Sequence, residues 1–318
     1  MAMNGLFLQE FRRQKEQIDE LASNLSQRPL TRIEAYVLYS SRYLPAVRYF
    51  LHHTCFSIQD ARKLETKWML ALLPKLGYNR NMPRAVIFGP QDLGGSGLIK
   101  IEYEQVACQT EDFICTLRKG DDMSMNYKIA AEAIQALLGS NTQFFLLDLT
   151  RHPHRQTNTR LGFLWEQLHK YNARIEAHDL WVPPLAHTND RNIMDDFLAQ
   201  QDKRKGTLSA VHPKDLINAN ACRLYLKVYK ISDITTSDGK EIAAWAMDGT
   251  DKKETHLIIP YQEKKHNSAW QTWRRQLRHT YLVRDRILAI PLTTPTNLEM
   301  EATRFTTYSD TCHHMNNK

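Results

Sequence analysis

The chain opens with a helical pattern of apolar side chains. Between residues 4 and 25, apolar residues recur on one stripe of a helix and polar residues occupy its other faces: Phe7, Phe11, Ile18, Leu21 and Leu25. This spacing predicts an amphipathic helix within residues 1–30. Thr31 followed by Glu34 has the pattern of a capping box, which predicts that a second helix begins there and runs toward Cys55.

The second predicted helix is apolar and aromatic on most of its faces. Its segment 36–56 is rich in tyrosine, phenylalanine and aliphatic residues, so we expect protein on more than one side of it. Pro45 lies in the middle and predicts a kink, because proline lacks the N–H of a helical hydrogen bond. Ser57 is the expected cap of a third helix, and Pro74 with Gly77 predicts where that helix ends.

A short strand, a loop and two helices are expected next. Residues 84–88 have the apolar character of a strand. Residues 89–98, here called the glycine loop, contain Gly94, Gly95 and Gly97. Helical patterns follow over residues 101–117 and 125–138.

The composition changes beyond residue 140. Residues 141–158 join an apolar run to a His, Pro, Arg and Thr segment, which predicts a hinge between two domains. A β-hairpin is expected around Ser237-Asp238-Gly239, flanked by Ile234 and by residues 242–247. The tail 293–318 is rich in Thr, Asn and His and is expected to be disordered. Helices are predicted over residues 159–171, 190–201, 213–230 and 268–282.

Composition and charge narrow the class of protein. The 318 residues are 42% hydrophobic and 24% charged, which is typical of a globular chain with a buried core. No apolar run approaches the ~20 residues that span a bilayer, and the N-terminus has no signal-peptide core. Five cysteines without a C-x-x-C pair fit thiols in a reducing compartment, so we expect an intracellular protein with no membrane association. The net charge of +7 favours an anionic partner such as nucleic acid.

The glycine loop lacks the spacing of a phosphate-binding motif. A P-loop needs Lys followed by Ser or Thr directly after its last glycine, whereas Gly97 is followed by Leu98 and Ile99. The string Gly-Gly-Ser-Gly does not match the dinucleotide pattern G-x-G-x-x-G either. The glycines therefore predict a structural turn, and no cofactor is expected.

Candidate catalytic and metal-binding residues are better explained by structural roles. Asp121-Asp122 lies at a predicted helix start, where aspartate caps, and Asp195-Asp196 lies in a helical pattern that points adjacent side chains apart. The small histidine groups lack the spaced partners of a zinc site. No nucleophile motif such as G-x-S-x-G occurs. The sequence therefore predicts no catalytic and no metal-binding residues.

Two basic clusters are the strongest candidates for a binding surface. The first consists of Lys75, Arg80 and Arg84, just before the glycine loop. The second lies between residues 264 and 286, where helical spacing puts Arg274, Arg278 and Tyr281 on neighbouring positions next to Arg275. A face of this kind can pair with phosphates. Three apolar residues of the same helix would form its buried stripe: Trp270, Trp273 and Leu277.

Four motifs follow one another in the first half of the chain: Tyr-Leu-Pro-Ala at 43–46, Leu-Pro-Lys-Leu-Gly-Tyr-Asn-Arg-Asn-Met-Pro-Arg-Ala at 73–85, Phe-Gly-Pro at 88–90 and Gly-Gly-Ser-Gly-Leu at 94–98. Their order resembles reverse transcriptases encoded by non-LTR-type retroelements, in the region just after the palm where the chain enters the thumb. Leu-Trp-Val-Pro-Pro-Leu at 180–185, Asn-Ala-Cys-Arg-Leu-Tyr-Leu at 220–226, Ser-Asp-Ile at 232–234 and Asp-Gly at 238–239 are similar to the C-terminal extension of such proteins. The resemblance covers roughly residues 30 to 290.

This resemblance implies a fold and a domain order. The fold would be mainly α with a small β component: a thumb-like helical domain over 31–140, the hinge, and a helical extension with a β-hairpin over 159–292. The family's aromatic-x-Asp-Asp motif of the palm is missing, since Ile193 stands two residues before Asp195 and Lys119 two before Asp121. The resemblance therefore implies a non-catalytic fragment of a retrotransposon-encoded RNA-directed DNA polymerase, which would not itself be an enzyme.

Three functional hypotheses follow. The first is sequence-independent binding of RNA or DNA through backbone contacts of Lys75, Arg80 and Arg84 and of Arg274, Arg275 and Arg278. The second is a protein-interaction subunit that docks on a separate polymerase through the aromatic helix 36–56. The third is a metal-dependent hydrolase whose metal site has no recognisable motif.

Overall fold

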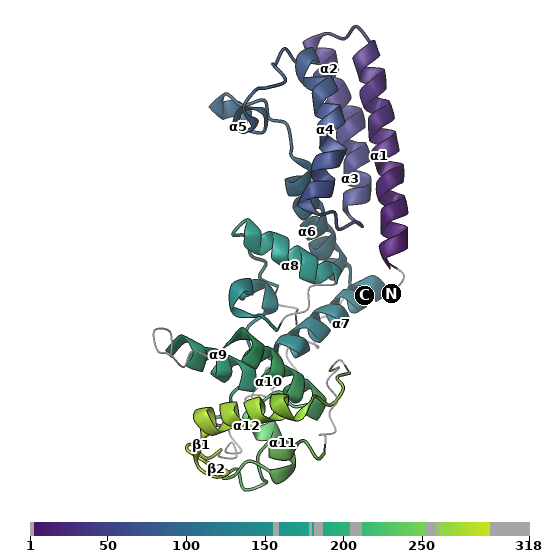
Figure 1. Ribbon diagram of the computed structural model, residues 1–318. Helices are drawn as coiled ribbons and strands as arrows, with labels where there is room; N and C mark the ends of the chain where they lie inside the picture. Colours follow the sequence, from purple (N-terminus) through teal and green to yellow (C-terminus); the bar gives the residue numbers. More distant parts are fainter. Residues whose placement is uncertain are drawn as a thin grey trace, which may run out of the picture. The chain divides into compact units, whose positions relative to one another are not determined.

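The computed structural model describes residues 3–154, 159–177, 180, 187–203, 212–251, 259 and 261–292. It is mainly helical with one small antiparallel hairpin (Figure 1), which confirms the predicted fold class. The chain forms two compact units, Met1–Tyr127 and Lys128–Lys318. No helix of the described residues is long and apolar enough to cross a membrane.

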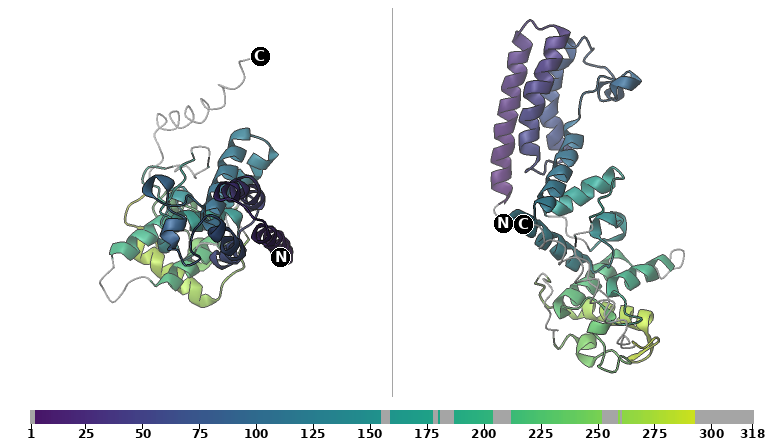
Figure 2. Two further views of the ribbon diagram at one scale, coloured as in Figure 1. Left: turned by 90° about the horizontal axis from the view of Figure 1, so that it is seen from above. Right: turned by 180° about the vertical axis from the view of Figure 1, so that it is seen from behind.

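The first unit is built on long helices that lie side by side (Figures 1 and 2). Its elements are α1 (Met3–Gln27), α2 (Arg32–Leu38), the π-helical turn η1 (Tyr39–Tyr43), α3 (Leu44–Leu51), α4 (Ile58–Lys75), α5 (Arg84–Ile87), η2 (Gln91–Leu93) and α6 (Ile101–Lys119). α7 (Asp122–Leu138) contains the boundary between the units. The helices predicted near the N-terminus and after residues 31, 57 and 101 are therefore confirmed.

Local signals in the sequence fix where these helices begin. The Thr31 hydroxyl accepts the N–H of Glu34, and the Glu34 carboxylate accepts the N–H of Thr31 at 2.8 Å, which is the predicted capping box. Ser57 caps α4 by accepting the N–H of Asp60 at 3.2 Å. These caps satisfy donors that a helix start otherwise leaves without a partner.

A π-helical turn precedes Pro45, at the position where a kink was expected. The chain runs from α2 through η1 into α3, and the N–H of Leu44 donates to the carbonyl of Tyr39, five residues earlier. The wider turn lies directly before Pro45, which has no N–H to donate. One extra residue in a single turn thus accommodates the proline within a continuous helical segment.

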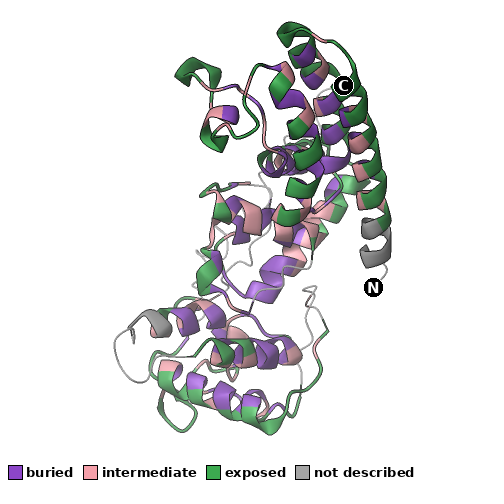
Figure 3. Cartoon of the chain, turned by 45° about the horizontal axis from the view of Figure 1, so that its top comes forward, coloured by how far each residue is buried: buried purple, intermediate pink, exposed green. Residues whose placement is uncertain are grey.

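The core of the first unit lies between α1, the α2–η1–α3 segment, α4 and α6. Buried positions on these helices face one another, while the outer faces are exposed (Figure 3). Trp68 of α4 is fully buried and stacks on Tyr43. Phe56 makes edge contacts with Phe11 and Phe50.

The second unit surrounds a separate core. After two short 3-10 turns, η3 (Phe144–Leu146) and η4 (Leu149–Arg151), it contains α8 (Arg160–Lys170), α9 (Ile193–Lys203), α10 (Pro213–Leu226), η5 (Ile231–Asp233), α11 (Ala244–Asp248) and α12 (Asn267–Tyr281). Residues of α9, α10 and α12 enclose the fully buried Trp273, against which Phe197 packs edge-on. Each predicted helix of this half has a counterpart.

A buried arginine holds the C-terminal end of α7 to α10. Arg223 is 0% exposed and donates to the carbonyls of Ala136 at 2.6 Å and Leu137 at 3.0 Å, and also to Val228. Carbonyls of the last helical turn lack intrahelical partners, so a cation there satisfies them and complements the helix dipole. Burial nevertheless lowers the pKa of Arg223 to about 10. The Asn220 side chain completes this cap.

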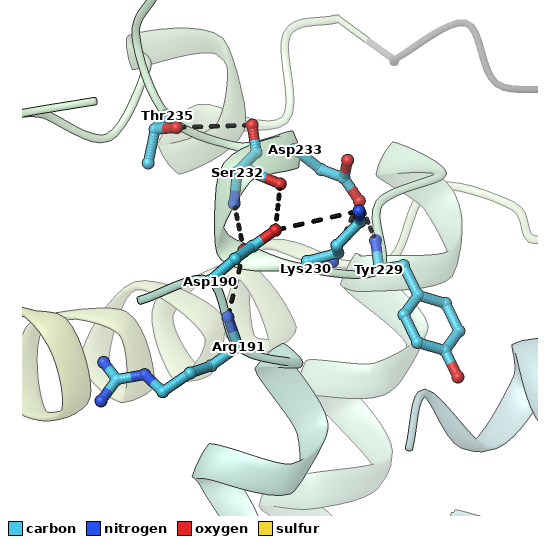
Figure 4. A network of polar contacts seen from close by, with 7 residues as sticks. All are labelled: Asp190, Arg191, Tyr229, Lys230, Ser232, Asp233 and Thr235. Carbon is cyan, nitrogen blue, oxygen red and sulfur yellow. Dashed lines mark hydrogen bonds and ion pairs between the residues drawn. The ribbon is translucent and has the colours of Figure 1, made fainter. Parts of the chain in front are cut away.

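A polar network centred on Asp190 joins two segments of the second unit (Figure 4). It ties the turn η5 to the residues just before α9. The buried Asp190 carboxylate accepts the Ser232 hydroxyl at 2.7 Å and the Ser232 N–H at 3.1 Å, and Lys230 lies 3.8 Å away. Asp233 accepts the N–H groups of Tyr229 and Lys230. Since each of these carboxylates has several donors, the network explains the Ser-Asp-Ile string as a structural element.

Two local predictions were wrong. Of the segment 84–88, Arg84–Ile87 form the one-turn helix α5 and Phe88 follows it, so the segment is not a strand. The hairpin consists of β1 (Leu282–Arg284) and β2 (Ile287–Leu288), whereas the expected position at 237–239 has one bridge, Thr235 to Ile242, followed by α11. Residues 155–158 of the predicted hinge, residues 181–185 and the tail 293–318 lie outside the described residues.

Candidate nucleic-acid interface

The glycine loop is a close-packed turn whose backbone donors are already used. The five consecutive N–H groups from Gly94 to Leu98 donate to the backbone carbonyls of Gln91, Pro90, Val86, Gly89 and Ile87, at 2.8 to 3.3 Å. A phosphate cradle needs such N–H groups free to point at the ligand. The loop therefore has no backbone phosphate site at residues 94–98.

Glycine is required where the loop crosses itself. A Cβ on Gly95 would lie 2.2 Å from the carbonyl oxygen of Gly89, and a Cβ on Gly89 would lie 2.5 Å from that of Ala85. Gly94 and Gly97 have φ angles of +82° and +67°, which side chains disfavour. The glycines thus let α5 and the returning chain pack backbone to backbone.

Three tyrosines attach this loop to the helices. The Tyr39 hydroxyl accepts the N–H of Ile99 at 2.8 Å, and the Tyr36 hydroxyl accepts the Gln91 side chain at 3.3 Å. The Tyr78 side chain is hydrogen-bonded to Ser96. This bond, together with Arg32, lowers the pKa of the Tyr78 phenol. The loop and the cations on either side of it are therefore held to one end of the helical layer.

The predicted residues Lys75, Arg80 and Arg84 lie at this end. Lys75 is in the last turn of α4, Arg80 follows in the connection, and Arg84 is the first residue of α5. Arg80 and Arg84 are exposed and Lys75 is partly exposed. The Lys75 ammonium donates to the backbone carbonyl of Arg28 at 2.6 Å, which brings the connection between α1 and α2 beside it.

Two further cations, Arg28 and Arg32, belong to the same surface and were missed by the sequence prediction. Arg32 donates to the Tyr78 hydroxyl at 3.2 Å, with its guanidinium 5.2 Å from the ring centroid. No run of basic residues marks either arginine in the sequence. We call the five residues Arg28, Arg32, Lys75, Arg80 and Arg84 the basic end.

The charges of the basic end are not neutralised by neighbours. Among the described residues, none of its five cations forms an ion pair with a carboxylate. Three acids lie nearby: Glu34, whose carboxylate is engaged in the capping box, the exposed Asp92 of η2, and the buried Glu65 of α4, whose pKa the Arg84 charge acts to lower. The five cations outnumber these acids, so the local balance is positive.

The second basic cluster has a different character. Arg275 pairs with Asp215 at 2.9 Å, and Arg274 lies 3.6 Å from Asp248. Only Arg278 of the three predicted residues is exposed without a carboxylate partner among the described residues. Trp270, Trp273 and Leu277 form the expected buried stripe, but Tyr281 is buried too and does not share a surface with the arginines.

The aspartate pairs contact other parts of the chain. Asp121 caps α7 by accepting the N–H of Ser124 at 2.9 Å. Asp195 accepts the N–H of Asn141, and Asp196 lies 3.1 Å from Arg191. Within the described ranges, no three His, Cys, Asp or Glu side chains are grouped so as to hold a metal ion.

The aromatic helix 36–56 buries one of its faces within its own unit. Tyr39, Tyr43, Val47 and Phe50 lie in the core, each at most 4% exposed, because α1, α4 and α6 cover this face. Three residues of the same segment are exposed, Tyr36, Val37 and Tyr49. Docking on a separate polymerase through this segment therefore stays a prediction.

The basic end assembles cations from three separate segments, residues 28–32, residue 75 and residues 80–84. Only the folded unit brings these segments together, since Lys75 contacts Arg28 and Tyr78 contacts Arg32. The chain matches no protein-family model, no curated protein and no solved structure.

Proposed function

We propose that the basic end binds the sugar-phosphate backbone of double-stranded nucleic acid without reading its sequence. This is the role that a thumb-like segment of a retroelement reverse transcriptase-like protein would have, and no catalytic residue is assigned to the chain. The observation that carries the proposal is the set of five cations on one end of the first unit, none of which forms an ion pair with a carboxylate in the part of the chain that the structure describes.

Unpaired cations favour phosphate binding for an energetic reason. A cation already paired with a carboxylate must give up that pair before it binds phosphate, whereas an unpaired one only exchanges water and counterions. Arg274 and Arg275 are of the first kind, whereas no cation of the basic end pairs with a carboxylate among the described residues. The basic end is therefore the better of the two candidate surfaces.

The hydrogen bonds around Tyr78 support the same proposal. Arg32 is held by the Tyr78 hydroxyl, and Lys75 by the Arg28 carbonyl, so both side chains lose less conformational freedom on binding than free ones would. Contacts of this type position a nucleic acid but carry no base information. The expected ligand is accordingly a duplex of any sequence.

Salt dependence of binding tests the proposal. The logarithm of the affinity should fall with the logarithm of salt concentration with a slope of about −0.9 per phosphate contact. Replacing Lys75, Arg80 and Arg84 together by Ala should flatten this slope by up to about 2.7 units and weaken all sequences alike. Adding Arg28→Ala and Arg32→Ala should flatten it further.

A matched control removes the same charge elsewhere in the same unit. Arg13, Lys63 and Lys67 are cations of α1 and α4 that lie near Glu10, Asp60 and Asp19. Their triple alanine variant should leave the slope within about one unit of the wild type. An equal loss in both triple variants, or an unchanged slope in the first with its circular dichroism intact, would refute the proposal.

The non-catalytic part of the proposal has its own test. The purified chain should extend no primer on an RNA or DNA template with Mg²⁺ or Mn²⁺, because two-metal transfer needs converging carboxylates that the sequence lacks. Template-dependent extension above a blank would show that this part is wrong.

A further inference from the structure

The outer face of the helical segment from α2 to α3 carries a row of exposed residues, most of them apolar. Its members, here called the outer stripe, are Ile33, Val37, Ser41, Pro45 and Tyr49, and all five are exposed. Ile33, Val37 and Tyr49 are 77%, 53% and 78% exposed. The opposite face of the same segment is buried in the core of the first unit. A helix that is apolar on both sides predicts that a partner covers the outer side.

The π turn keeps the outer stripe on one face. Each step along it is four residues, which in an α-helix turns the direction of the side chain by about 40° beyond a full turn. Four such steps would rotate the stripe by about 160°. The extra residue of η1 takes back about 100° of this rotation, so Tyr49 stays on the side of Ile33. The exposure of all five residues agrees with this geometry.

The order of side-chain sizes along the outer stripe is the same from either end. The large residues Ile33 and Tyr49 lie at its ends, the smaller Val37 and Pro45 lie inside them, and Ser41 is at the centre. Two helices that cross are closest at the crossing point and separate on both sides of it. A small residue at the centre and large residues at the ends therefore fit a crossing at Ser41.

A second copy of the chain fits this order, because a two-fold interface must be complementary to itself. With two segments antiparallel about Ser41, Ile33 of one copy meets Tyr49 of the other, and Val37 of one meets Pro45 of the other. The Ser41 hydroxyl donates to the Val37 carbonyl of its own helix at 2.6 Å. Burial of Ser41 in the contact therefore leaves no donor without a partner.

Charge distinguishes the outer stripe from the basic end. The stripe contains no charged residue, and Arg48 beside it pairs with Glu104 of α6. Arg42 is exposed and forms no ion pair among the described residues. Because Arg42 follows Ser41, the two copies of Arg42 repel each other across an antiparallel pair, and salt screens this repulsion. Salt should therefore strengthen the contact, whereas it weakens binding to phosphates.

We propose that the chain forms a symmetric dimer in which the outer stripes of two copies pack antiparallel and cross at Ser41. The inference does not rest on the proposed function, since no residue of the outer stripe belongs to the basic end. Each segment begins beside Arg28 and Arg32, so the dimer carries its two basic ends at opposite ends of the paired helices.

Sedimentation velocity of the full chain between about 1 and 100 µM tests this inference. The wild type should show a monomer–dimer equilibrium whose dissociation constant falls as salt is raised. Tyr49→Ser removes a large residue from the contact and should raise that constant about tenfold or more. The matched control is Leu70→Ser, which changes an exposed apolar residue of α4 outside the stripe and should leave the constant unchanged.

Ser41→Leu distinguishes a symmetric contact from non-specific association. It adds apolar surface, so non-specific association would increase. A leucine at the crossing point holds the two helices apart, so the proposed dimer should be abolished.

Disulfide cross-linking gives a second measurement. Under mild oxidation, Ser41→Cys should form a linked dimer above the background that the native cysteines, such as the exposed Cys115, give in the wild type. Thr66→Cys of α4 is the control, because Thr66 is likewise exposed and its hydroxyl likewise donates to a carbonyl of its own helix, that of Arg62.

The outcomes that overturn the inference are specific. A chain that stays monomeric at the highest concentration overturns it and leaves the outer stripe to a different partner. A dimer that survives Ser41→Leu or Tyr49→Ser, or equal cross-linking of Ser41→Cys and Thr66→Cys, overturns it as well. Failure of duplex binding would overturn the proposed function alone, because no nucleic acid is present in these measurements.

Discussion

Tyr43 lies flat against Trp68, with ring centroids 4.2 Å apart and ring planes inclined by 1°. Both side chains are buried, and burial raises the pKa of the Tyr43 phenol well above its usual value. The Tyr43 hydroxyl has no hydrogen-bond partner among the described residues, whereas the Tyr39 hydroxyl one turn earlier accepts the N–H of Ile99. In the same core, the hydroxyl of Tyr39 is therefore satisfied by a hydrogen bond and that of Tyr43 is not.

This contrast predicts opposite effects of the same substitution. Tyr43→Phe removes an unsatisfied buried hydroxyl and should leave the free energy of unfolding unchanged or raise it by up to about 1 kcal/mol. Tyr39→Phe leaves the Ile99 N–H unpaired and should lower it by about 1–3 kcal/mol. Urea unfolding monitored by circular dichroism measures both, and the reverse order would contradict the assigned hydrogen bonds.

The chain crossing in the glycine loop predicts a second matched pair. Gly95→Ala places a methyl group against the Gly89 carbonyl, so it should separate the crossing and cost about 1–3 kcal/mol or more. Gly94→Ala meets open space and should cost about 1–2 kcal/mol, because only the left-handed backbone is penalised. Thermal unfolding of both variants gives the comparison. A cost for Gly95→Ala no larger than that of Gly94→Ala would contradict the close crossing of the two backbones.

Two of the three arginines of the second basic cluster are paired with carboxylates, so we expect their replacement to have a small effect on duplex binding. The triple variant Arg274→Ala, Arg275→Ala, Arg278→Ala should flatten the salt slope for duplex by no more than about one unit, since Arg278 is the member without a carboxylate partner. The same titration on the triple variant of Lys75, Arg80 and Arg84 should give the larger change. A larger change from the α12 variant would reverse the assignment of the dominant surface.

His152 predicts a pH dependence of stability in the second unit. Its ring is 4% exposed, and burial lowers its pKa below 6.5, although the hydrogen bond to the Asp148 carbonyl acts against this. The unfolded chain then takes up a proton more readily than the folded one. The contribution of His152 to the free energy of unfolding is therefore fully present above about pH 6.5. It is lost as the pH falls from there through the lower pKa of the folded state.

Replacing His152 by Gln should remove this part of the pH dependence. Midpoints of urea unfolding between about pH 7 and pH 5 should fall less in the variant than in the wild type. Parallel falls in both chains would assign the pH dependence to other groups.

Helices were predicted well where the sequence carries a strong local signal. α1 has a long apolar stripe, and α2 and α4 begin at side-chain caps, Thr31 with Glu34 and Ser57, that act over three residues. Such local signals do not depend on the rest of the fold. The segment 84–88 had no such signal, and four apolar residues fit a strand or a helical turn equally. Its helical form follows from backbone bonds to residues 96–98, which are tertiary.

The hairpin was misplaced for a related reason. The Asp-Gly pair at 238–239 is the usual turn signal, yet it closes only one bridge. The actual hairpin turns at Asp285, a non-glycine residue with a φ of +41°, and β1 follows directly from α12. Packing of α12 on its unit therefore decides where the two strands meet.

The candidate site could be predicted only in part. Lys75, Arg80 and Arg84 are close in the sequence and were visible as a cluster. Arg28 and Arg32 join them through Tyr78 and the Arg28 carbonyl, contacts that span more than 40 residues. The sequence also could not show that two arginines of the second cluster are paired with carboxylates, because Asp215 and Asp248 are far from Arg275 and Arg274 in the sequence.

The bonded backbone of the glycine loop has a consequence for motion. Surface loops usually exchange their amide hydrogens with solvent quickly, because those hydrogens bond to water. Here the amides of residues 94–98 all bond to carbonyls of residues 86–91, so none can exchange until the two stretches part. Deuterium uptake at these five positions should be slow and should share one rate, which would make the glycine loop one of the more slowly exchanging parts of the first unit.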